Sequence, residues 1–280
     1  MRILYALFAF VFCASNSNAQ VLWKISDTEK KQEGYLMGTI HMLPKADREN
    51  FKMPEDLIRS ADKVILELNP DIGLEDRFEM ATSMILPDKK KLPELISDTL
   101  LNRLDKLFID TFQIKEKRLY NQYYNLKPMY LSMIIMTEQI GEFTAIDDEV
   151  GKVAKKAKIE VVGLESVYEQ VGFLNSIPLE EQLSWLSDMN STMMDDYHDL
   201  VRYYIKGDLD SLAISSAEQM TSDLEQKLAI DRNKNWIPRI KGHLEEGKIF
   251  VAVGSLHLTG KEGLIELLRE EGYKLEPITQ

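Results

Sequence analysis

An α/β fold is indicated first by the stretch Lys248-Ile249-Phe250-Val251-Ala252-Val253-Gly254-Ser255-Leu256-His257, an apolar run that ends in polar residues. The run predicts a strand. It is followed by helical spacing over residues 263–271 and by a last short strand over residues 273–278. Strands that alternate with helices in this way favour an α/β core with a mainly parallel central sheet.

The same alternation extends through the rest of the chain. Strands are predicted over residues 21–26, 35–41, 63–68, 144–147 and 158–164, and helices over residues 54–62 and 149–157. Two longer segments, around residues 74–142 and 179–240, have mostly helical spacing and are expected to flank the sheet and form a helical cap region. No linker rich in glycine, proline or serine divides residues 20–280, so we expect a single domain with two helical insertions.

Two five-residue segments match each other in residue type at every position. They are Gly38-Thr39-Ile40-His41-Met42 and Gly254-Ser255-Leu256-His257-Leu258, and each follows β-type apolar residues. Because residues two apart share one face of a strand, the hydroxyl residue and the histidine of each segment are expected to point the same way. Each glycine is expected on the opposite face, where a missing side chain permits close packing or unusual backbone torsions.

Both histidines fall at the predicted carboxyl ends of their strands, where open α/β sheets bind ligands. The capping-box spacing of Thr259 and Glu262 predicts a helix that starts just beyond His257. A single histidine in this setting favours a partly buried side chain with satisfied hydrogen bonds. Two histidines in matched settings, His41 and His257, favour a shared site.

An acidic residue ends a third apolar run. Glu67 follows Val64-Ile65-Leu66, and a carboxylate at the end of an apolar strand is costly unless it is paired or bound to a metal. A solvated strand-end glutamate is an equally good interpretation of Glu67 alone. Together with His41 and His257 it completes a plausible ligand shell for a divalent metal ion, although the long-range spacing lacks the specificity of a local metal motif.

Four further polar residues are candidates for the same site. Asp147 and Glu165 come at predicted strand ends, and Arg232 and Asn233 fall in a helical stretch. A guanidinium can hold a substrate carboxylate or stabilise a developing oxyanion. The alternatives are solvated carboxylates for the two acids and a surface salt bridge for Arg232.

The N-terminus has the order of a secretory signal peptide. Arg2 is followed by an apolar run over residues 3–12 and by Ser17-Asn18-Ala19, a small-x-small cleavage pattern, so cleavage is expected after Ala19. Cys13, the only cysteine, falls within residues 1–19, so the mature chain would have no thiol. We therefore expect a periplasmic or secreted protein. No other run approaches the about 20 apolar residues that span a bilayer, so no membrane span is expected after cleavage.

The net charge of the chain limits its partners. A formal charge of -12 makes nucleic-acid binding a poor expectation, because phosphate contacts need clustered lysine and arginine. Nothing in the composition sets the oligomeric state.

In these polar residues the chain resembles the TraB/PrgY/GumN family, which is related to the Tiki metalloproteases. The resemblance covers nearly the whole mature chain and is carried by an ordered set of short pieces: Gly38-Thr39-Ile40-His41, Leu66-Glu67-Leu68, Ala145-Ile146-Asp147, Gly163-Leu164-Glu165-Ser166 with Gln170, Tyr204-Ile205-Lys206-Gly207-Asp208, Arg232-Asn233 with Trp236, and Gly254-Ser255-Leu256-His257 with Gly260 and Gly263-Leu264. Ala145 stands where the family usually has glycine. The resemblance implies an α/β fold of the type shared with erythromycin esterases and a haem-binding lipoprotein family.

The resemblance also implies an active centre. His41, Glu67 and His257 would belong to it with Arg232 and Asn233 nearby, and manganese or cobalt would be the expected metal. We therefore expect a metal-dependent hydrolase, specifically a peptidase acting on a peptide or protein, in which one of the acids is the general base. Two alternatives stay open: a non-catalytic binding protein for a peptide signal or a haem-like ligand, and a metal-free, esterase-like hydrolase in which one histidine is the base.

Overall fold

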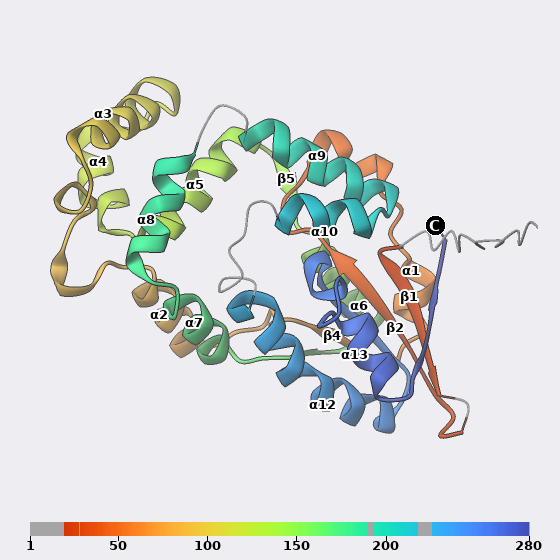
Figure 1. The fold of residues 1–280 in the computed structure, drawn as a ribbon. Helices are drawn as coiled ribbons and strands as arrows, with labels where there is room; N and C mark the ends of the chain where they lie inside the picture. Colours follow the sequence, from red (N-terminus) through yellow and green to blue (C-terminus); the bar gives the residue numbers. More distant parts are fainter. Residues whose placement is uncertain (1–19, 28, 190–192, 218–225, 280) are drawn as a thin grey trace, which may run out of the picture.

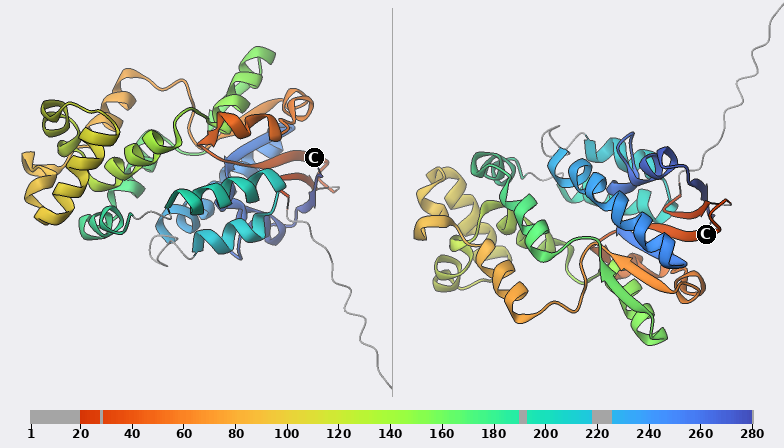
Figure 2. Two further views of the ribbon diagram at one scale, coloured as in Figure 1. Left: turned by 90° about the horizontal axis from the view of Figure 1, so that it is seen from above. Right: turned by 90° about the horizontal axis from the view of Figure 1, so that it is seen from below.

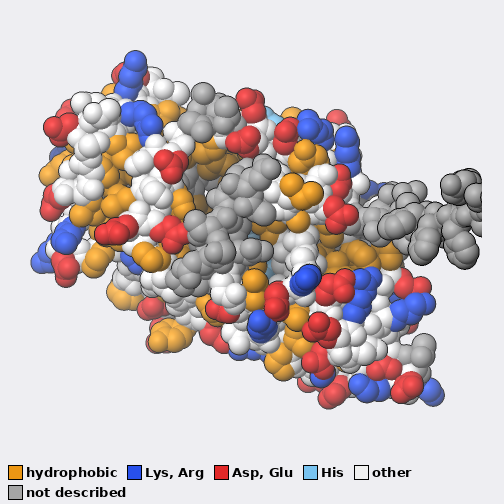
Figure 3. All heavy atoms as spheres, viewed as in Figure 1, with side chains coloured by type: hydrophobic (Ala, Val, Ile, Leu, Met, Phe, Trp, Pro, Cys, Tyr) orange, Lys and Arg blue, Asp and Glu red, His pale blue; other side chains and the backbone are white. Residues whose placement is uncertain are grey.

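The structure is a computed structural model that describes residues 20–27, 29–189, 193–217 and 226–279 (Figure 1). The expected signal peptide over residues 1–19, with Cys13, lies outside the described residues. None of the described helices is both long enough and apolar enough to cross a membrane. On the face shown in Figure 3, acidic and basic side chains are interspersed rather than separated into patches of one sign.

The central sheet has six strands. They are β1 (Leu22–Asp27), β2 (Gln32–Thr39), β4 (Lys63–Leu66), β6 (Glu160–Gly163), β7 (Ile249–Gly254) and β8 (Lys274–Pro277), arranged in the order β6-β4-β7-β2-β1-β8. The first four strands in this order run parallel, whereas β1 and β8 pair antiparallel. The α/β prediction is therefore confirmed, with a mixed sheet, because a short connection between β1 and β2 reverses the chain.

β7 lies at the centre of the parallel part of the sheet. Its residues from Ile249 to Val253 are buried, as expected of a parallel strand covered on both faces. β2 pairs with β7 in a register that sets Gly38 opposite Val253 and Thr39 opposite Gly254. The two matching segments therefore leave the sheet side by side.

Both strands end earlier than the sequence predicts. β2 stops at Thr39, and β7 gives way at Ser255 to the 3₁₀ helix η7 (Ser255–Leu258). The hydroxyl of Ser255 donates a hydrogen bond to the carbonyl of Thr39 at 2.9 Å. The expectation that His41 and His257 share strand faces with their hydroxyl neighbours was therefore wrong, because both histidines lie beyond the ladder.

Two other boundary predictions were wrong. The predicted strand over residues 144–147 shrinks to β5 (Phe143–Thr144), which pairs with β3 (Leu43–Pro44), and Asp147 lies in the first turn of α6 (Ile146–Ala157). An acidic first turn suits the helix dipole. The predicted capping box is not formed either, because the Thr259 hydroxyl donates backwards to the carbonyl of Leu256 and the next helix, α13 (Leu264–Glu270), begins later.

The other helices cover the sheet or form a separate lobe. They are α1 (Glu55–Arg59), α2 (Leu74–Ser83), α3 (Asp98–Lys106), α4 (Glu116–Asn121), α5 (Pro128–Ile140), α7 (Val167–Asn175), α8 (Leu179–Asp188), α9 (Met193–Lys206), α10 (Leu209–Ala217) and α12 (Asp231–Glu246). Short 3₁₀ or π turns are η1 (Lys45–Asn50), η2 (Pro87–Lys89), η3 (Leu92–Glu94), η4 (Leu107–Thr111), η5 (Tyr123–Asn125) and η6 (Gln226–Ile230). Figure 2 shows α6 on one face of the sheet and α12 on the other.

The two predicted helical insertions pack differently. α3, α4, α5 and α8 lie to one side of the sheet and share an apolar cluster around Phe108 and Leu131 (Figures 1 and 2). α9, α10 and α12 contribute Tyr204, Leu212 and Trp236 to the apolar core of the sheet itself. The first insertion and α8 thus form the cap-like part, and the single-domain organisation stays a prediction.

Candidate active site

Four parallel strands bring their carboxyl ends to one edge of the sheet, where ligands bind in open α/β folds. Glu67 directly follows β4, and Glu165 comes two residues after β6. His41 comes two residues after β2, and His257 lies in η7. All seven residues that the sequence predicts for the site lie in this region: His41, Glu67, Asp147, Glu165, Arg232, Asn233 and His257.

The guanidinium of Arg232 is at the centre of this group, and all five of its N–H bonds are used. Nε and Nη2 donate to the two oxygens of Glu165 at 3.2 and 2.7 Å, and Nη2 also donates to Glu67 Oε2 at 2.5 Å. Nη1 donates to the carbonyl of Leu228 at 3.0 Å and to His257 Nε2 at 3.1 Å. Arg232 is therefore saturated by the protein and has no N–H bond free for a substrate.

The hydrogen bonds around His257 define its tautomer. A guanidinium cannot accept, so Nε2 beside Arg232 carries the lone pair, and Nδ1 carries the proton that it donates to Asn233 Oδ1 at 2.7 Å. The amide of Asn233 is held in this orientation because its Nδ2 donates to the carbonyls of His257 and Glu262 at 3.1 and 2.8 Å. Burial lowers the pKa of His257 to about 4 although Glu67 opposes the shift, so the imidazole is neutral at pH 7.

Glu67 is a buried carboxylate with partners at both oxygens. Oε1 accepts the Gly254 N–H at 2.8 Å and lies 3.8 Å from His257 Nε2, while Oε2 accepts from Arg232. Burial alone would raise the pKa of Glu67, but His257, Arg232, His41 and the Gly254 N–H together lower it to about 2. Because His257 is neutral at pH 7, Arg232 is the closest positive charge that keeps Glu67 ionised there.

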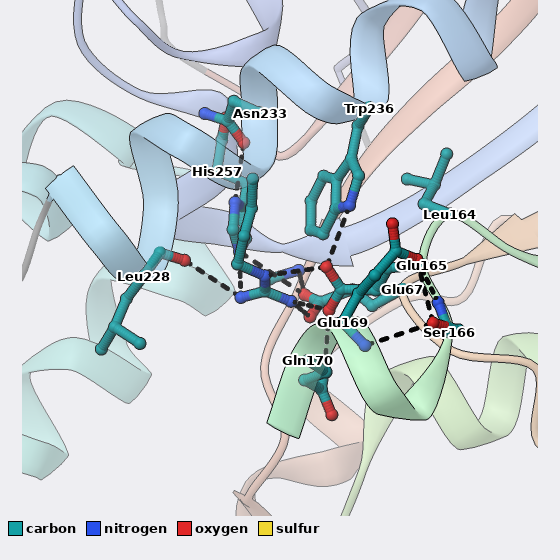
Figure 4. Close-up of polar contacts among 12 residues, drawn as sticks. Glu67, Leu164, Glu165, Ser166, Glu169, Gln170, Leu228, Asn233, Trp236 and His257 are labelled. Atoms are coloured by element: carbon teal, nitrogen blue, oxygen red, sulfur yellow. Dashed lines mark hydrogen bonds and ion pairs between the residues drawn. The ribbon is translucent and has the colours of Figure 1, made fainter. Parts of the chain in front are cut away.

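Glu165 supports Arg232 from behind. It is buried, and besides Arg232 it accepts hydrogen bonds from Gln170 Nε2 at 3.0 Å and from Trp236 Nε1 at 3.2 Å (Figure 4). Burial raises the pKa of Glu165, and the Arg232 and Gln170 hydrogen bonds oppose the rise. The ring of Trp236 lies 4.7 Å from Arg232 Cζ and 4.4 Å from the His257 ring, so it packs against both.

His41 has the opposite setting to its sequence match. Its side chain is 59% exposed, and Nδ1 lies 3.1 Å from Asp147 Oδ1, so Nδ1 donates to the carboxylate. The hydrogen bond and charge of Asp147, with a further contribution from Glu67, outweigh desolvation and raise the pKa of His41 to about 9. At pH 7 the matching segments therefore present an imidazolium at the rim and a neutral imidazole inside.

The two glycines of the matching segments are needed for close approach. A Cβ on Gly38 would stand 2.8 Å from Ser255 Oγ and 3.1 Å from the Ser255 Cα. A Cβ on Gly254 would stand 3.2 Å from Glu67 Oε1, and His257 Cδ2 and His41 Nε2 are both within 4 Å of the same point. The side chains of these three site residues thus converge on the open side of Gly254, so the expected close packing agrees with this geometry. The expectation that Gly254 lies on the face opposite its histidine was wrong, because its missing side chain faces the histidines.

Gly38→Ala is expected to destabilise the fold by about 1–3 kcal/mol, because its new methyl meets the backbone of the neighbouring strand end. Gly242→Ala is the matched control, since Gly242 lies within α12 and a Cβ there would meet nothing within 4 Å. It is expected to stabilise by about 0.4–1 kcal/mol. Urea unfolding measures both values, and equal shifts would contradict the close-approach explanation.

A pocket of about 300 Å³ opens beside the network. His41, Glu67, Arg232 and His257 are among the residues that line it, together with the buried Thr39. Asp147, Glu165 and Asn233 do not line the pocket. Those three residues instead hold His41, Arg232 and His257 in place from outside it.

The expected metal-ligand set is not formed. Among the residues that the structure describes, no group of three or more His, Cys, Asp or Glu side chains is placed to hold a metal ion. The reason is chemical: the lone pair of His257 Nε2 and the carboxylate of Glu67 both face the Arg232 guanidinium, which takes the place of a cation. The raised pKa of His41 also favours its protonated form, whereas a metal ligand must be deprotonated.

Residue-by-residue reasoning from the sequence missed three contributors to the site. Trp236 and Gln170 entered only through the resemblance, and both bond Glu165. The carbonyl of Leu228, in the π turn η6, accepts from Arg232. The four-residue spacing of Arg232 and Trp236 on one helix face is the signal that would have found Trp236; a backbone carbonyl has no sequence signal.

Comparison with known proteins gives relatives over most of the chain. The chain is 21% identical to "Metalloprotease TIKI2" of Danio rerio over 91% of its own length and spans 60% of that protein. It is 22% identical to "Uncharacterized protein YbaP" of Shigella flexneri, covering 85% of this chain and 88% of the relative. The protein of the same name from Escherichia coli (strain K12) is 23% identical, with 84% and 87% covered.

A family model gives the broader assignment. The model described as the TraB/PrgY/gumN family matches residues 21–277, which include every residue of the site described above. The match therefore covers the sheet, both helical insertions and α12. The chain belongs to the TraB/PrgY/gumN family.

Proposed function

We propose that this chain is a hydrolase that cleaves a peptide bond, with His41 as its general base. The observation that carries the proposal is the Asp147–His41 pair: Nδ1 of His41 is 3.1 Å from Asp147 Oδ1, and His41 also lines the pocket beside Glu67 and Arg232. A carboxylate that holds one imidazole nitrogen leaves the other free for proton transfer. The metalloprotease relative supports peptide hydrolysis as the reaction class.

The proposed reaction uses only groups of this chain and water. Neutral His41 removes a proton from a water molecule whose oxygen attacks the substrate carbonyl carbon. The imidazolium then gives that proton to the departing amine nitrogen as the carbon–nitrogen bond breaks. The positive charge of Arg232 at the edge of the pocket stabilises the negative charge that develops on the carbonyl oxygen through the field, without a direct hydrogen bond.

The roles proposed for the remaining residues follow from their contacts. Glu67 and Glu165 hold the Arg232 charge, and Asn233 fixes the tautomer of His257. His257 is a positioning residue because its Nε2 accepts from Arg232 and its ring is buried. The same contact withholds the lone pair that ligation of a haem iron would need.

Metal dependence is where the relative and the site disagree. The name of the Danio rerio relative supports a metal, with manganese or cobalt expected from the family resemblance. The donors in the site do not fit one while Arg232 holds Glu67 and His257. The proposed reaction therefore includes no step at a metal ion.

The experiment is digestion of a library of peptides blocked at both ends, read by mass spectrometry, with EDTA, with added Mn²⁺ and with added Co²⁺. We expect cleavage that EDTA leaves within about 2-fold of the untreated rate, whereas loss of a working catalytic group costs about 10²–10⁴-fold. Cleavage that needs Mn²⁺ or Co²⁺ would overturn the metal-free reaction but would still support the hydrolase activity. No cleavage under any of the three conditions would overturn the proposal.

A further inference from the structure

We infer that the pocket beside His41 takes an uncharged apolar side chain of the substrate and rejects a free carboxylate. This specificity rests on the proposed peptide hydrolysis, but it follows from different features: the apolar wall of the pocket and the exhausted donors of Arg232. It names the substrate as a peptide cleaved beside an apolar residue within the chain, rather than at a charged or terminal one.

The apolar part of the pocket lining, called the apolar wall here, comes from five separate segments. Its members are Ile40 after β2, Leu200 of α9, Leu212 of α10, Leu228 of η6 and Leu256 of η7. These side chains all belong to or pack against the apolar core of the sheet, apart from Leu228, which packs against a small cluster around Tyr130. A wall of this composition gains free energy by removing an apolar side chain from water.

Arg232 offers no free donor to an additional anion. Every N–H bond of Arg232 is already donated to the protein, and two of its partners, Glu67 and Glu165, are themselves carboxylates. Two buried carboxylates therefore already share one buried guanidinium. A substrate carboxylate placed against Arg232 would lose its hydration without gaining a donor there, which is a costly exchange. The charged donor left to it is His41, whose side chain is largely exposed.

The size of the pocket suits a small occupant such as one apolar side chain. A volume of about 300 Å³ is at the small end of the range of ligand pockets. Leucine, methionine or phenylalanine would bring enough apolar surface to use the wall. A lysine would place an ammonium group against the apolar wall, where it also loses hydration.

The test compares blocked peptides that differ at one position, carrying leucine, phenylalanine, aspartate or lysine, and a leucine peptide that ends there in a free carboxylate. Binding is measured by calorimetry on His41→Gln protein, which does not consume the peptide, and cleavage is measured on the unaltered protein. The leucine and phenylalanine peptides are expected to bind at least about 10-fold more tightly than the aspartate and free-carboxylate peptides. Equal binding across the series would overturn the inference.

The two arms separate this inference from the proposed function. Preferential binding of leucine peptides without any cleavage would support the apolar specificity of the pocket and contradict the proposed hydrolase activity. Cleavage at the same rate whatever the side chain, with equal binding of all the peptides, would support the hydrolase activity and contradict the apolar specificity of the pocket.

A variant that fills part of the pocket tests whether the apolar wall causes the preference for apolar side chains. Leu200→Phe is expected to weaken binding of the phenylalanine peptide by about 10-fold or more, because the added ring takes up pocket volume. Leu267→Phe is the matched control, since Leu267 is a partly buried leucine of the same apolar core on α13 and does not line the pocket. Equal effects of the two variants would contradict the assignment of this wall.

Discussion

Arg232→Met is expected to lower the free energy of unfolding at pH 7 by about 3–5 kcal/mol, because it leaves Glu67 and Glu165 buried without their counter-charge. Methionine keeps an unbranched apolar side chain against Trp236, so the loss reports the charge more than the packing. His257 Nε2 also loses its donor. Urea unfolding followed by circular dichroism gives the value.

The difference in the free energy of unfolding between Arg232→Met and the unaltered protein is expected to shrink as the pH falls. In the unaltered protein the pKa of Glu67 is lowered to about 2, so its ionisation stabilises the fold above the unfolded pKa of about 4.3 and this stability is lost as pH falls towards 2. In Arg232→Met, burial dominates and raises the pKa of both acids. Such groups stabilise most below the unfolded pKa and destabilise as the pH rises, so the two proteins converge only as the pH approaches 2.

Arg239→Met on the same helix is the matched control. Arg239 pairs with Glu169, but both side chains are more than one third exposed, so the pair is expected to contribute about 1 kcal/mol or less. A second check is Arg232→Met combined with Glu67→Gln and Glu165→Gln, which removes the stranded charges and should recover part of the loss. Equal losses at positions 232 and 239, or a deficit independent of pH, would contradict a buried charge centre.

The sheet could be predicted where the information is local. The apolar run that forms β7 and the acid that ends β4 are readable because a buried strand shows its composition along the chain, and Glu67 stands at its end. The order β6-β4-β7-β2 could not be read, because strands far apart in sequence pair through backbone hydrogen bonds that any residue makes.

The residues of the site were predictable, but their protonation and pairing were not. His41 and His257 sit in matching segments, yet one is exposed beside Asp147 and the other is buried beside Arg232. The sequence offers two histidines and an acid, which is a ligand set by type. Only the tertiary structure reveals that a guanidinium lies among them, because its partners come from the segments that follow β4 and β6 and from η6 and η7.

His41→Gln is expected to lower kcat/KM for a cleaved peptide by about 10²–10⁴-fold, because glutamine can occupy the position but cannot accept and return a proton. His243→Gln is the control, since His243 also lies beside a carboxylate, Glu246 at 3.4 Å, but does not line the pocket. Its rate should stay within about 2-fold, well below the effect of a lost base. Equal rates for His41→Gln and the unaltered protein would remove His41 from the mechanism.

The pH profile separates a base from a residue that merely packs. A general base acts when deprotonated, so kcat/KM of the unaltered protein should rise with pH, with its midpoint near the pKa of His41, about 9, and level off above it. Asp147→Asn removes the hydrogen bond and charge that raise this pKa, so the midpoint should move to lower pH. The plateau should also fall, because the ring loses the partner that fixes its tautomer. A lower plateau with an unmoved midpoint would mean that Asp147 holds the loop in place and that another group titrates in the reaction.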